Sequence, residues 1–318
     1  MSLKEIAAEL NKFSSVLIFC HTRPDGDTLG CATALKIALE KKGKKADIIC
    51  DSAVPEKFGF IPAINSVVNN VKELSCRYEA HVAVDCSVEG MMGETYYHFV
   101  KSNNTFNIDH HISNSKYAKF NYVENRAACC EIMYEFLTVG GFDIDEEVST
   151  CLMLGICTDT GYFIHSNVTD STLFIASELL KRGAKLHEIG KKLFKSQKKA
   201  RALLYADVTS KIRFYLDDKL AMISIMKQDL EKFGATSDMT EGFIDFPVSI
   251  EGVEVAVSIL ENKPNCYKIS FRSSGKVDVN KVAASFGGGG HILASGCMIN
   301  GFFEDVKDKV IRAVSLYL

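Results

Sequence analysis

The chain has 318 residues, of which 47% are hydrophobic and 24% charged, and its formal net charge is −3. This length and apolar content are sufficient for two domains, each with its own core. The small negative charge argues against a large basic face that holds long nucleic acid. Short oligonucleotides and mononucleotides stay open as substrates, because a bound metal ion supplies its own positive charge.

The cysteines and the N-terminus bear on the compartment. The eleven cysteines form no CxxC pair, and Cys129 and Cys130 are adjacent, which suits neither a disulfide framework nor a zinc ribbon. Most are expected to be small buried residues in a reducing cytosol. No run approaches the roughly 18 apolar residues of a membrane span, and the opening MSLKEIAAELNKF is an amphipathic helix pattern without a signal-peptide core. We therefore expect a soluble, cytoplasmic protein without a membrane partner.

The first half alternates short apolar runs with helical patterns, which predicts an α/β fold with a mostly parallel sheet and helices on both faces. Continuous apolar runs such as VLIFC are typical of strands buried on both sides. Gly43 is expected to end the first long helix. The predicted strands are Val16–Cys20, Ala46–Cys50, Ala80–Val84 and Thr105–Ile108, and the predicted helices cover 28–42, 127–139, 146–158 and 169–182.

The pattern changes near residue 205, which predicts a domain over 1–185, a helical linker or hinge over 186–204, and a smaller α+β domain over 205–318. Residues 181–201 are strongly basic. We interpret them as a helix with a solvated charged face, and the alternative is that the lysines attract an anionic substrate. The predicted strands of the second domain are Ile212–Leu216, Leu220–Ile225, Val253–Leu260 and Tyr267–Arg272, with helices near 227–233, 238–246, 279–286 and 303–316.

Acidic and histidine side chains recur where these elements of the first half end. In open α/β sheets ligands bind beyond the carboxyl ends of the strands, so one edge of the sheet would collect them. They would repel one another unless a cation lay among them, and an oxygen-rich set with imidazoles suits Mn²⁺ or Mg²⁺. The residues are His21, Asp25, Asp27, Asp85, Asp109, His110, His111 and Asp159.

These motifs have structural alternatives. Asp85 could be only a turn residue at the end of a strand, and the rings of His110 and His111 could be only hydrogen-bonded in the interior. Asp27 could cap the helix that follows it while Asp25 shapes a turn. Asp159 ends a helical run, where its charge opposes the helix dipole, so another partner should offset that cost. His110 and His111 cannot both face one way on a strand, so one can bind metal while the other faces substrate.

The second domain carries two candidate substrate contacts. Gly287–Gly290 precede His291, and consecutive glycines can close backbone N–H groups on an anion, although a flexible loop is the alternative. Arg272 ends a strand and could grip a phosphate or carboxylate with two hydrogen bonds, although such an arginine is often only a surface residue.

Together these motifs resemble the DHH phosphoesterase superfamily, in the family's order and over nearly the whole chain. Arg272 and the Gly288-Gly289-Gly290-His291 run look like its DHHA1 substrate-binding domain, and the layout is similar to the nanoRNase branch, the oligoribonucleases and pAp phosphatases. Cys31 and Ser295 stand where the family often has other small residues. The remaining matches are His21-x-x-Pro24-Asp25-Gly26-Asp27-x-x-Gly30, Asp85, Asp109-His110-His111-x-Ser113-Asn114 and Asp159.

The resemblance implies two Mn²⁺ ions, with Mg²⁺ as an alternative, and a hydroxide that both ions activate. His21, Asp25 and Asp85 would hold one ion. Asp27, Asp85, His110 and Asp159 would hold the other, with Asp85 bridging. His111 would donate a proton or a hydrogen bond to the transition state. Arg272, Gly288, Gly289, Gly290 and His291 would hold the phosphate or base of a short nucleotide.

The favoured function is hydrolysis of short oligoribonucleotides and of pAp, with linear products of cyclic dinucleotides as further substrates. Hydrolysis of cyclic di-AMP is the alternative within the same enzyme class. A family II pyrophosphatase is disfavoured because its second domain usually carries a Lys/Arg-rich motif in place of GGGGH. An exonuclease acting on long single strands is disfavoured because the net charge of the chain is negative. A nucleotide sensor without turnover would fit a substituted ligand, and none is present. Whether the chain forms a homodimer is left open.

Overall fold

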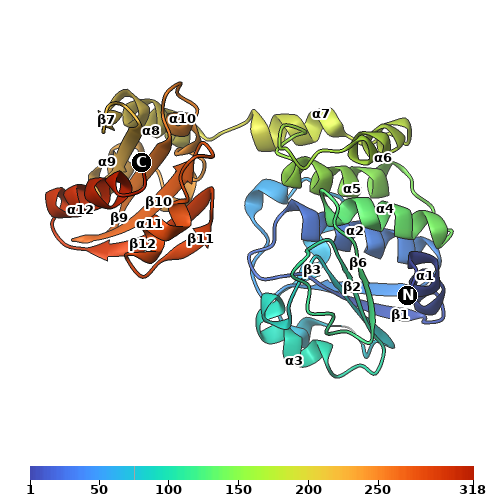
Figure 1. Cartoon of the computed structure of the whole chain (residues 1–318). Helices are drawn as coiled ribbons and strands as arrows, with labels where there is room; N and C mark the ends of the chain where they lie inside the picture. The colour runs from blue at the N-terminus through green and yellow to red at the C-terminus, as the bar shows by residue number, and fades with distance from the viewer. Residues whose placement is uncertain (75) are drawn as a thin grey trace. The chain divides into compact units, whose positions relative to one another are not determined.

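The computed structural model describes residues 1–74 and 76–318, and the chain divides into two compact units, Met1–Ser196 and Gln197–Leu318 (Figure 1). The division falls inside 186–204, the range of the predicted linker. Before it the chain forms α7 (Leu186–Ile189) and a π-helical turn (Gly190–Phe194), and α8 (Lys199–Ser210) follows. Helical segments thus lie on both sides of the division.

A parallel sheet of six strands organises the first unit, in the order β3-β2-β1-β4-β5-β6. The chain leaves β1 toward β2 on one side and later adds β4 on the other, so the strand order reverses between β1 and β4. A crevice forms at such a switch point beyond the carboxyl ends of the two strands. The strands are β1 (Ser15–Phe19), β2 (Lys45–Ile49), β3 (Val67–Val68), β4 (Ala80–Val84), β5 (Thr105–Asp109) and β6 (Phe120–Val123).

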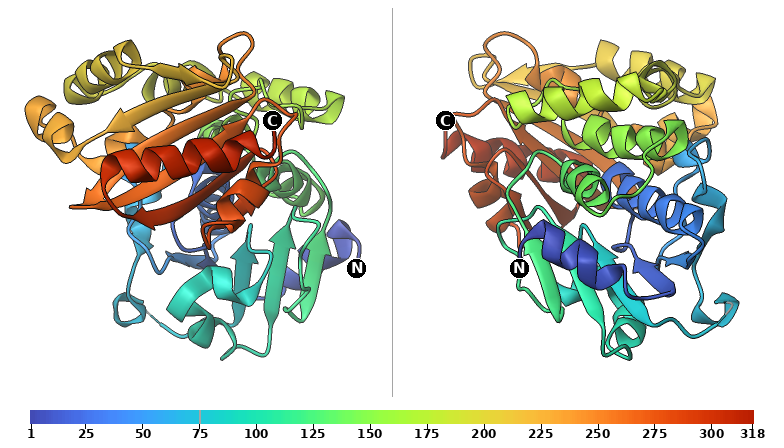
Figure 2. Two further views of the ribbon diagram at one scale, coloured as in Figure 1. Left: turned by 60° about the vertical axis from the view of Figure 1, so that its left-hand side comes forward. Right: turned by 90° about the vertical axis from the view of Figure 1, so that its right-hand side faces the viewer.

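Helices cover both faces of this sheet, as predicted. On one face the larger core brings α1, α2 and α4 against the strands, and α5 packs on α2 with α6 beyond it (Figures 1 and 2). On the other face a smaller core lies under α3 and a 3₁₀-helical turn over 89–95. The helices are α1 (Leu3–Leu10), α2 (Gly26–Lys41), α3 (Tyr96–Phe99), α4 (Cys129–Val139), α5 (Glu146–Asp159) and α6 (Asp170–Lys181).

The contact between α2 and α5 depends on glycine. A Cβ atom at Gly30 would lie 2.5 Å from the carbonyl oxygen of Cys151, and one at Gly155 would lie 2.3 Å from Cys130 Sγ and 2.4 Å from Asp27 Oδ1. Real Cβ atoms do not approach other atoms so closely, because interiors are close-packed. The two helices can therefore meet only where these side chains are absent.

We expect Gly155→Ala to lower the free energy of unfolding by at least about 2 kcal/mol, because overpacking a rigid core forces backbone shifts. Alanine favours helix over glycine by about 1 kcal/mol, which reduces the loss but does not reverse it. Urea denaturation followed by circular dichroism measures the change. Gly90→Ala is the matched control, since its Cβ would meet nothing within 4 Å. Equal stability of the two variants would contradict the packing argument.

His81 of β4 makes the stability of the first unit depend on pH. It is 4% exposed, its Nδ1 donates to the Phe99 carbonyl at 2.9 Å, and its ring stacks on His98. Burial lowers the pKa of His81 to about 4, so the ring is neutral in the folded protein. Below pH about 6.5 the unfolded chain binds a proton that the folded chain does not, so stability falls as the pH decreases toward 4.

We expect His81 to account for a loss of about 2 kcal/mol in unfolding free energy between pH 7.5 and pH 5. Urea titrations at the two pH values measure the loss. His81→Phe removes the titrating group, so that variant should be less stable at pH 7.5 but should lose about 2 kcal/mol less on acidification. The same pH dependence in both proteins would rule out His81 as the cause.

The second unit contains a mixed sheet of six strands, in the order β11-β12-β10-β9-β8-β7. Only β8 and β9 pair in parallel. One face packs against α11 and α12, and Figure 2 shows α12 along that face. The opposite face packs against α8 near β8. The elements are β7 (Arg213–Tyr215), β8 (Leu220–Ile225), α9 (Lys227–Phe233), α10 (Asp245–Val248), β9 (Val255–Lys263), β10 (Cys266–Ser273), α11 (Val279–Ala284), β11 (Gly289–His291), β12 (Ala294–Asn300) and α12 (Phe303–Ser315).

One sequence-based expectation for this unit was wrong, and the alternative offered for the glycine run does not hold. A helix over 238–246 is predicted, but a 3₁₀ turn (Ser237–Thr240) and α10 stand on either side of Gly242, whose φ of 79° cannot continue a helix. The glycine run is not simply a loop, because Gly289–His291 form the edge strand β11. A Cβ at Gly288 would lie 2.2 Å from the Gly296 carbonyl oxygen, so the run permits close pairing with β12.

No helix within the described ranges is both long and apolar enough to cross a membrane.

Candidate active site

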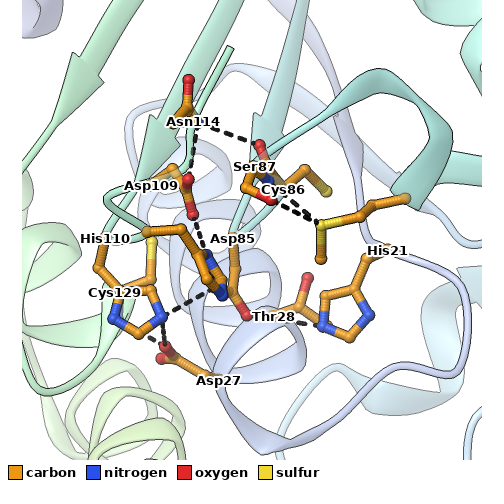
Figure 3. A network of polar contacts seen from close by, with 12 residues as sticks. His21, Asp27, Thr28, Asp85, Cys86, Ser87, Asp109, His110, Asn114 and Cys129 are labelled. Carbon is orange, nitrogen blue, oxygen red and sulfur yellow. Dashed lines mark hydrogen bonds and ion pairs between the residues drawn. The ribbon is translucent and has the colours of Figure 1, made fainter. Parts of the chain in front are cut away.

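Seven of the predicted site residues of the first unit converge at the carboxyl edge of its sheet. Figure 3 labels four of them, His21, Asp27, Asp85 and His110. His21 follows β1, Asp85 follows β4, and the two histidines of the Asp-His-His motif follow β5. Helix termini supply the remaining three carboxylates: two come from the start of α2 and one from the last residue of α5. The converging residues are His21, Asp25, Asp27, Asp85, His110, His111 and Asp159.

Asp85 is the centre of this arrangement. It is 2% exposed and has a φ of 56°, a left-handed conformation that turns the chain sharply at the end of β4. Its Oδ2 lies 3.5 Å from His21 Nε2, and its Oδ1 lies 3.4 Å from His110 Nε2. Asp85 Oδ1 also lies 3.6 Å from His111 Nδ1, so the carboxylate faces three histidines, one through Oδ2 and two through Oδ1.

One group of potential ligands consists of His21, Asp25 and Asp85. His21 Nε2 lies 3.5 Å from Asp25 Oδ1. The Nδ1 of His21 donates to the carbonyl oxygen of Thr22 at 2.9 Å, which directs Nε2 toward the carboxylates. Asp25 also caps α2, because its Oδ1 accepts from the backbone N–H groups of Asp27 and Thr28.

A second group consists of Asp27, His110 and Asp159. His110 Nε2 lies 3.9 Å from Asp27 Oδ2 and 3.7 Å from Asp159 Oδ2. The Nδ1 of His110 donates to the carbonyl oxygen of Arg126 at 3.0 Å, so here too the backbone fixes which ring nitrogen faces the acids.

Asp27 caps a helix, but not the one that follows it in sequence. Its Oδ1 accepts from the Cys130 N–H at 2.9 Å and its Oδ2 from the Cys129 N–H, so it caps the start of α4, whose own N-cap residue, Ala128, has no capping side chain. The alternative in which Asp27 caps α2 is wrong, because Asp25 occupies that position.

His111 differs from His110 in what its ring contacts. Its Nδ1 donates to Asp109 Oδ1 at 2.8 Å, and its side chain is 38% exposed. Asp109 is fully buried and also accepts from Asn114 Nδ2 at 2.6 Å. Burial alone would favour the protonated acid, but these hydrogen bonds hold the pKa of Asp109 below its usual range. A charged carboxylate thus orients His111, with Nδ1 engaged and Nε2 left as its other polar atom.

The electrostatics of the cluster show a shortage of positive charge. Burial and the neighbouring carboxylates raise the pKa of Asp159 to about 10 and that of Asp27 to about 7. Burial disfavours the charged form of His21 and His110, yet the adjacent carboxylates raise the pKa of both to about 10. In residues 1–74 and 76–318 the ion pairs of these acids are all with histidine.

These residues fit divalent metal ions. Asp85 Oδ1 is buried and has no hydrogen-bond partner among the described residues, which is costly for a carboxylate oxygen unless a cation satisfies it. The donors are carboxylate oxygens and imidazole nitrogens whose other ring nitrogen is already engaged, a mixture that suits Mn²⁺ or Mg²⁺. The cluster can therefore hold hard cations and use them on a phosphate ester.

The predicted substrate residues of the second unit share one part of its sheet. Arg272 of β10 pairs with Ala294 of β12, and Ala294 pairs with His291 of β11, so Arg272 and His291 stand in one row, about 10 Å apart along the sheet. Arg272 Nε lies 3.6 Å from Asp245 Oδ1. A cavity of about 320 Å³ beside Arg272 is also lined by Lys268 and Ser270 of the same strand.

Three groups that shape the site received no individual role from the sequence. Asp109 and Asn114 belong to the Asp-His-His motif region, and their positions flanking the two histidines were a usable signal. The Cys129 and Cys130 N–H groups that hold Asp27 are backbone donors at a helix start 102 residues away, and nothing in the residue types of a single sequence marks such a contact.

Comparison with known proteins agrees with this geometry. Residues 15–156 match the DHH family, N-terminal domain, and residues 217–318 match the DHHA1 domain. The chain is 29% identical over 302 residues to the bifunctional oligoribonuclease and PAP phosphatase NrnA of Thermus thermophilus, covering 94% of this chain and 89% of that one. The corresponding protein of Bacillus subtilis is 24% identical, with 96% of each chain covered.

A crystal structure of an exopolyphosphatase-related protein from Bacteroides fragilis superimposes with a TM-score of 0.89 at 26% identity, covering 99% of this chain and 96% of the other. The order of the two matched domains, the parallel sheet followed by the mixed sheet, and the acidic-histidine cluster are all present in one chain. The chain therefore belongs to the DHH/DHHA1 phosphoesterase family and is a metal-dependent hydrolase of that family.

Proposed function

We propose that this protein is a Mn²⁺-dependent phosphoesterase that hydrolyses short oligoribonucleotides to mononucleotides and pAp to AMP. The observation that carries the proposal is the position of Asp85, whose two oxygens face separate groups of ligands. His21, Asp25 and Asp85 would hold one ion, and Asp27, Asp85, His110 and Asp159 the other. Two such ions supply Lewis acidity and neutralise charge on the attacking and leaving oxygens of a phosphate ester.

The protein's own groups would position the substrate and transfer a proton. His111, held by Asp109, is suited to protonate a leaving oxygen from Nε2, because the adjacent carboxylate stabilises the imidazolium form. Arg272, His291 and the backbone of Gly288–Gly290 would hold a phosphate or base.

We further propose that residues 186–204 act as the hinge between the two units.

The names of the relatives support this choice of substrate: those of Thermus thermophilus and Bacillus subtilis are named for oligoribonuclease and PAP phosphatase activities. The cavity of the second unit carries Lys268 beside Arg272, two cations suited to a phosphate. The net charge of −3 agrees with a short rather than a long nucleic-acid substrate.

A side-by-side turnover assay with Mn²⁺ tests the proposal. It compares a 5′-phosphorylated RNA dinucleotide, pAp, cyclic di-AMP and pyrophosphate, with products separated by chromatography. We expect nucleoside monophosphate from the dinucleotide and AMP from pAp, and no turnover after chelation. Cleavage of cyclic di-AMP or pyrophosphate alone would assign the protein to another branch of the family. No turnover of any of the four substrates would favour a nucleotide sensor.

We expect His291→Ala to raise KM for the dinucleotide about tenfold or more while kcat changes little, because it removes a hydrogen bond to a charged group that the ground state already makes. Initial rates over a range of substrate concentrations measure both constants. Lys276→Ala is the control, a solvent-exposed cation of the same unit that pairs with Glu254. A large fall in kcat with unchanged KM would contradict a substrate-holding role.

A further inference from the structure

Two thiols that the proposed function does not use lie against the candidate metal centre. Cys31 of α2 and Cys130 of α4 are fully buried, and their sulfur atoms are 3.4 Å apart. Asp27 adjoins them, with its Oδ1 4.0 Å from Cys31 Sγ. The three donor atoms lie within 4.8 Å of one another. Asp27 is therefore shared between this thiol group and the cluster of His110 and Asp159.

The spacing of these atoms is close to that of a tetrahedral metal site. A Zn²⁺ ion with bonds of about 2.3 Å to sulfur and about 2.1 Å to oxygen separates two sulfurs by about 3.8 Å, and a sulfur from the oxygen by about 3.6 Å. The observed separations are 3.4 Å between the sulfurs and 4.0 Å from Cys31 Sγ to Asp27 Oδ1. These two separations each differ from the tetrahedral values by about 0.4 Å, and the third donor pair, Cys130 Sγ and the Asp27 carboxylate, lies within 4.8 Å.

The chemistry of the donors separates this group from the neighbouring centre. Thiolates select thiophilic ions such as Zn²⁺ and Cd²⁺, whereas carboxylate and imidazole donors accept Mn²⁺ or Mg²⁺. The nearest partly exposed groups belong to the cluster on the other side of Asp27, where the side chains of His110 and Asp159 are 14% and 19% exposed.

We propose that Cys31, Cys130 and Asp27 form a binding site for one thiophilic divalent ion. Binding releases the two thiol protons to solvent and leaves the ion held by two thiolates and one carboxylate. Asp27 would then divide one negative charge between two dications, with Oδ1 toward the thiols and Oδ2 toward His110, so an ion in the thiol site weakens ion binding in the hard-metal centre. This second consequence, inhibition, rests on the proposed function, whereas the binding does not.

Cadmium titration of the reduced, metal-free full-length protein tests the binding. Thiolate-to-cadmium charge transfer absorbs in the ultraviolet, and equilibrium dialysis gives Kd. We expect absorption that saturates with the first tightly bound ion, and a Kd raised by at least about 100-fold in Cys31→Ala and in Cys130→Ala, since loss of a direct ligand exceeds the effect of losing an outer-shell partner.

Controls separate this site from the other thiols. Cys151→Ser changes another buried thiol, whose Sγ faces the carbonyl oxygen of Pro62, and Cys76→Ser changes an exposed one. Both variants should keep the tight absorption. Urea denaturation without cadmium shows whether each variant folds, and Cys31→Ser is used if the alanine variant does not. Tight binding that persists in both cluster variants, or no tight binding by the wild type, would overturn the proposal.

The activity assay distinguishes the two proposals. In the presence of Mn²⁺, low concentrations of Cd²⁺ should inhibit dinucleotide hydrolysis in the wild type, and at least tenfold more Cd²⁺ should be needed in Cys31→Ala. Equal sensitivity of the two proteins would refute coupling of the two sites through Asp27. If no substrate is turned over but Cd²⁺ still binds through the two cysteines, the proposed function fails and the thiophilic site stands.

Discussion

Asp85→Asn is expected to reduce Mn²⁺-dependent turnover by at least about 1,000-fold, because it removes the charge that both groups of ligands share. Asparagine keeps the size of the side chain and tolerates the left-handed backbone at this position, where φ is 56°. The buried site would lose one negative charge and gain an amide that cannot bridge two cations. The fold should persist, because the change relieves repulsion among the remaining carboxylates.

Steady-state rates and calorimetric titration with Mn²⁺ measure this loss, and the calorimetric signal should fall together with the rate. Asp85→Ala should be as inactive and also less stable, since alanine is strained at positive φ. Asp51→Asn is the matched control, an exposed carboxylate that accepts a hydrogen bond from the Glu94 N–H. Near-wild-type activity of Asp85→Asn would refute the bridging role.

His111→Ala is expected to lower kcat by about 100-fold or more while leaving Mn²⁺ affinity within a few-fold of the wild type, because loss of a general acid typically costs 10²–10⁴ in rate. His111 engages Asp109 through Nδ1 and is the more exposed of the two adjacent histidines. A protonating group contributes to the barrier rather than to the binding of ions, so kcat and metal affinity should separate.

Asp109→Asn tests whether Asp109 positions and charges the ring of His111. The variant keeps the shape of the side chain but removes the charge that stabilises the imidazolium of His111, so kcat should fall with KM unchanged. Asp51→Asn again serves as the control, the same chemical change at an exposed carboxylate. Loss of Mn²⁺ binding in His111→Ala would show that His111 is a ligand instead of a proton donor.

The sequence predicted the parts of the fold that periodicity encodes. The strands before His21 and Asp85 and the helices α4, α5 and α6 were found to within a few residues, because apolar runs and amphipathic patterns mark them directly. Besides the short strands β3 and β11, the longer strands β6 and β12 were missed. Their side chains are half-buried or alternate with small residues such as Gly296, so partner strands far along the chain decide their conformation.

For the candidate site too, the sequence predicted what local patterns encode and missed what tertiary contacts decide. Residues directly after predicted strands could be assigned to one edge, because parallel strands end together. The roles of Asp25 and Asp27 as caps could not be assigned, since both are acidic residues near one helix start and only the tertiary position of α4 distinguishes them. The orientation of His110 by the Arg126 carbonyl oxygen could not be predicted from the sequence either, because every residue type has a backbone carbonyl group.

The double attachment of Asp27 to α4 bears on how this family loses activity during evolution. A lineage that no longer needed catalysis would still be selected to keep this aspartate, because its removal leaves two buried N–H groups at the start of a core helix without partners. Asp159 ends α5, where its charge opposes the helix dipole, and so would drift once turnover ceased to matter. Among related proteins, therefore, the presence of Asp159 rather than that of Asp27 would distinguish an active enzyme from a homologue that has kept the fold and lost catalysis.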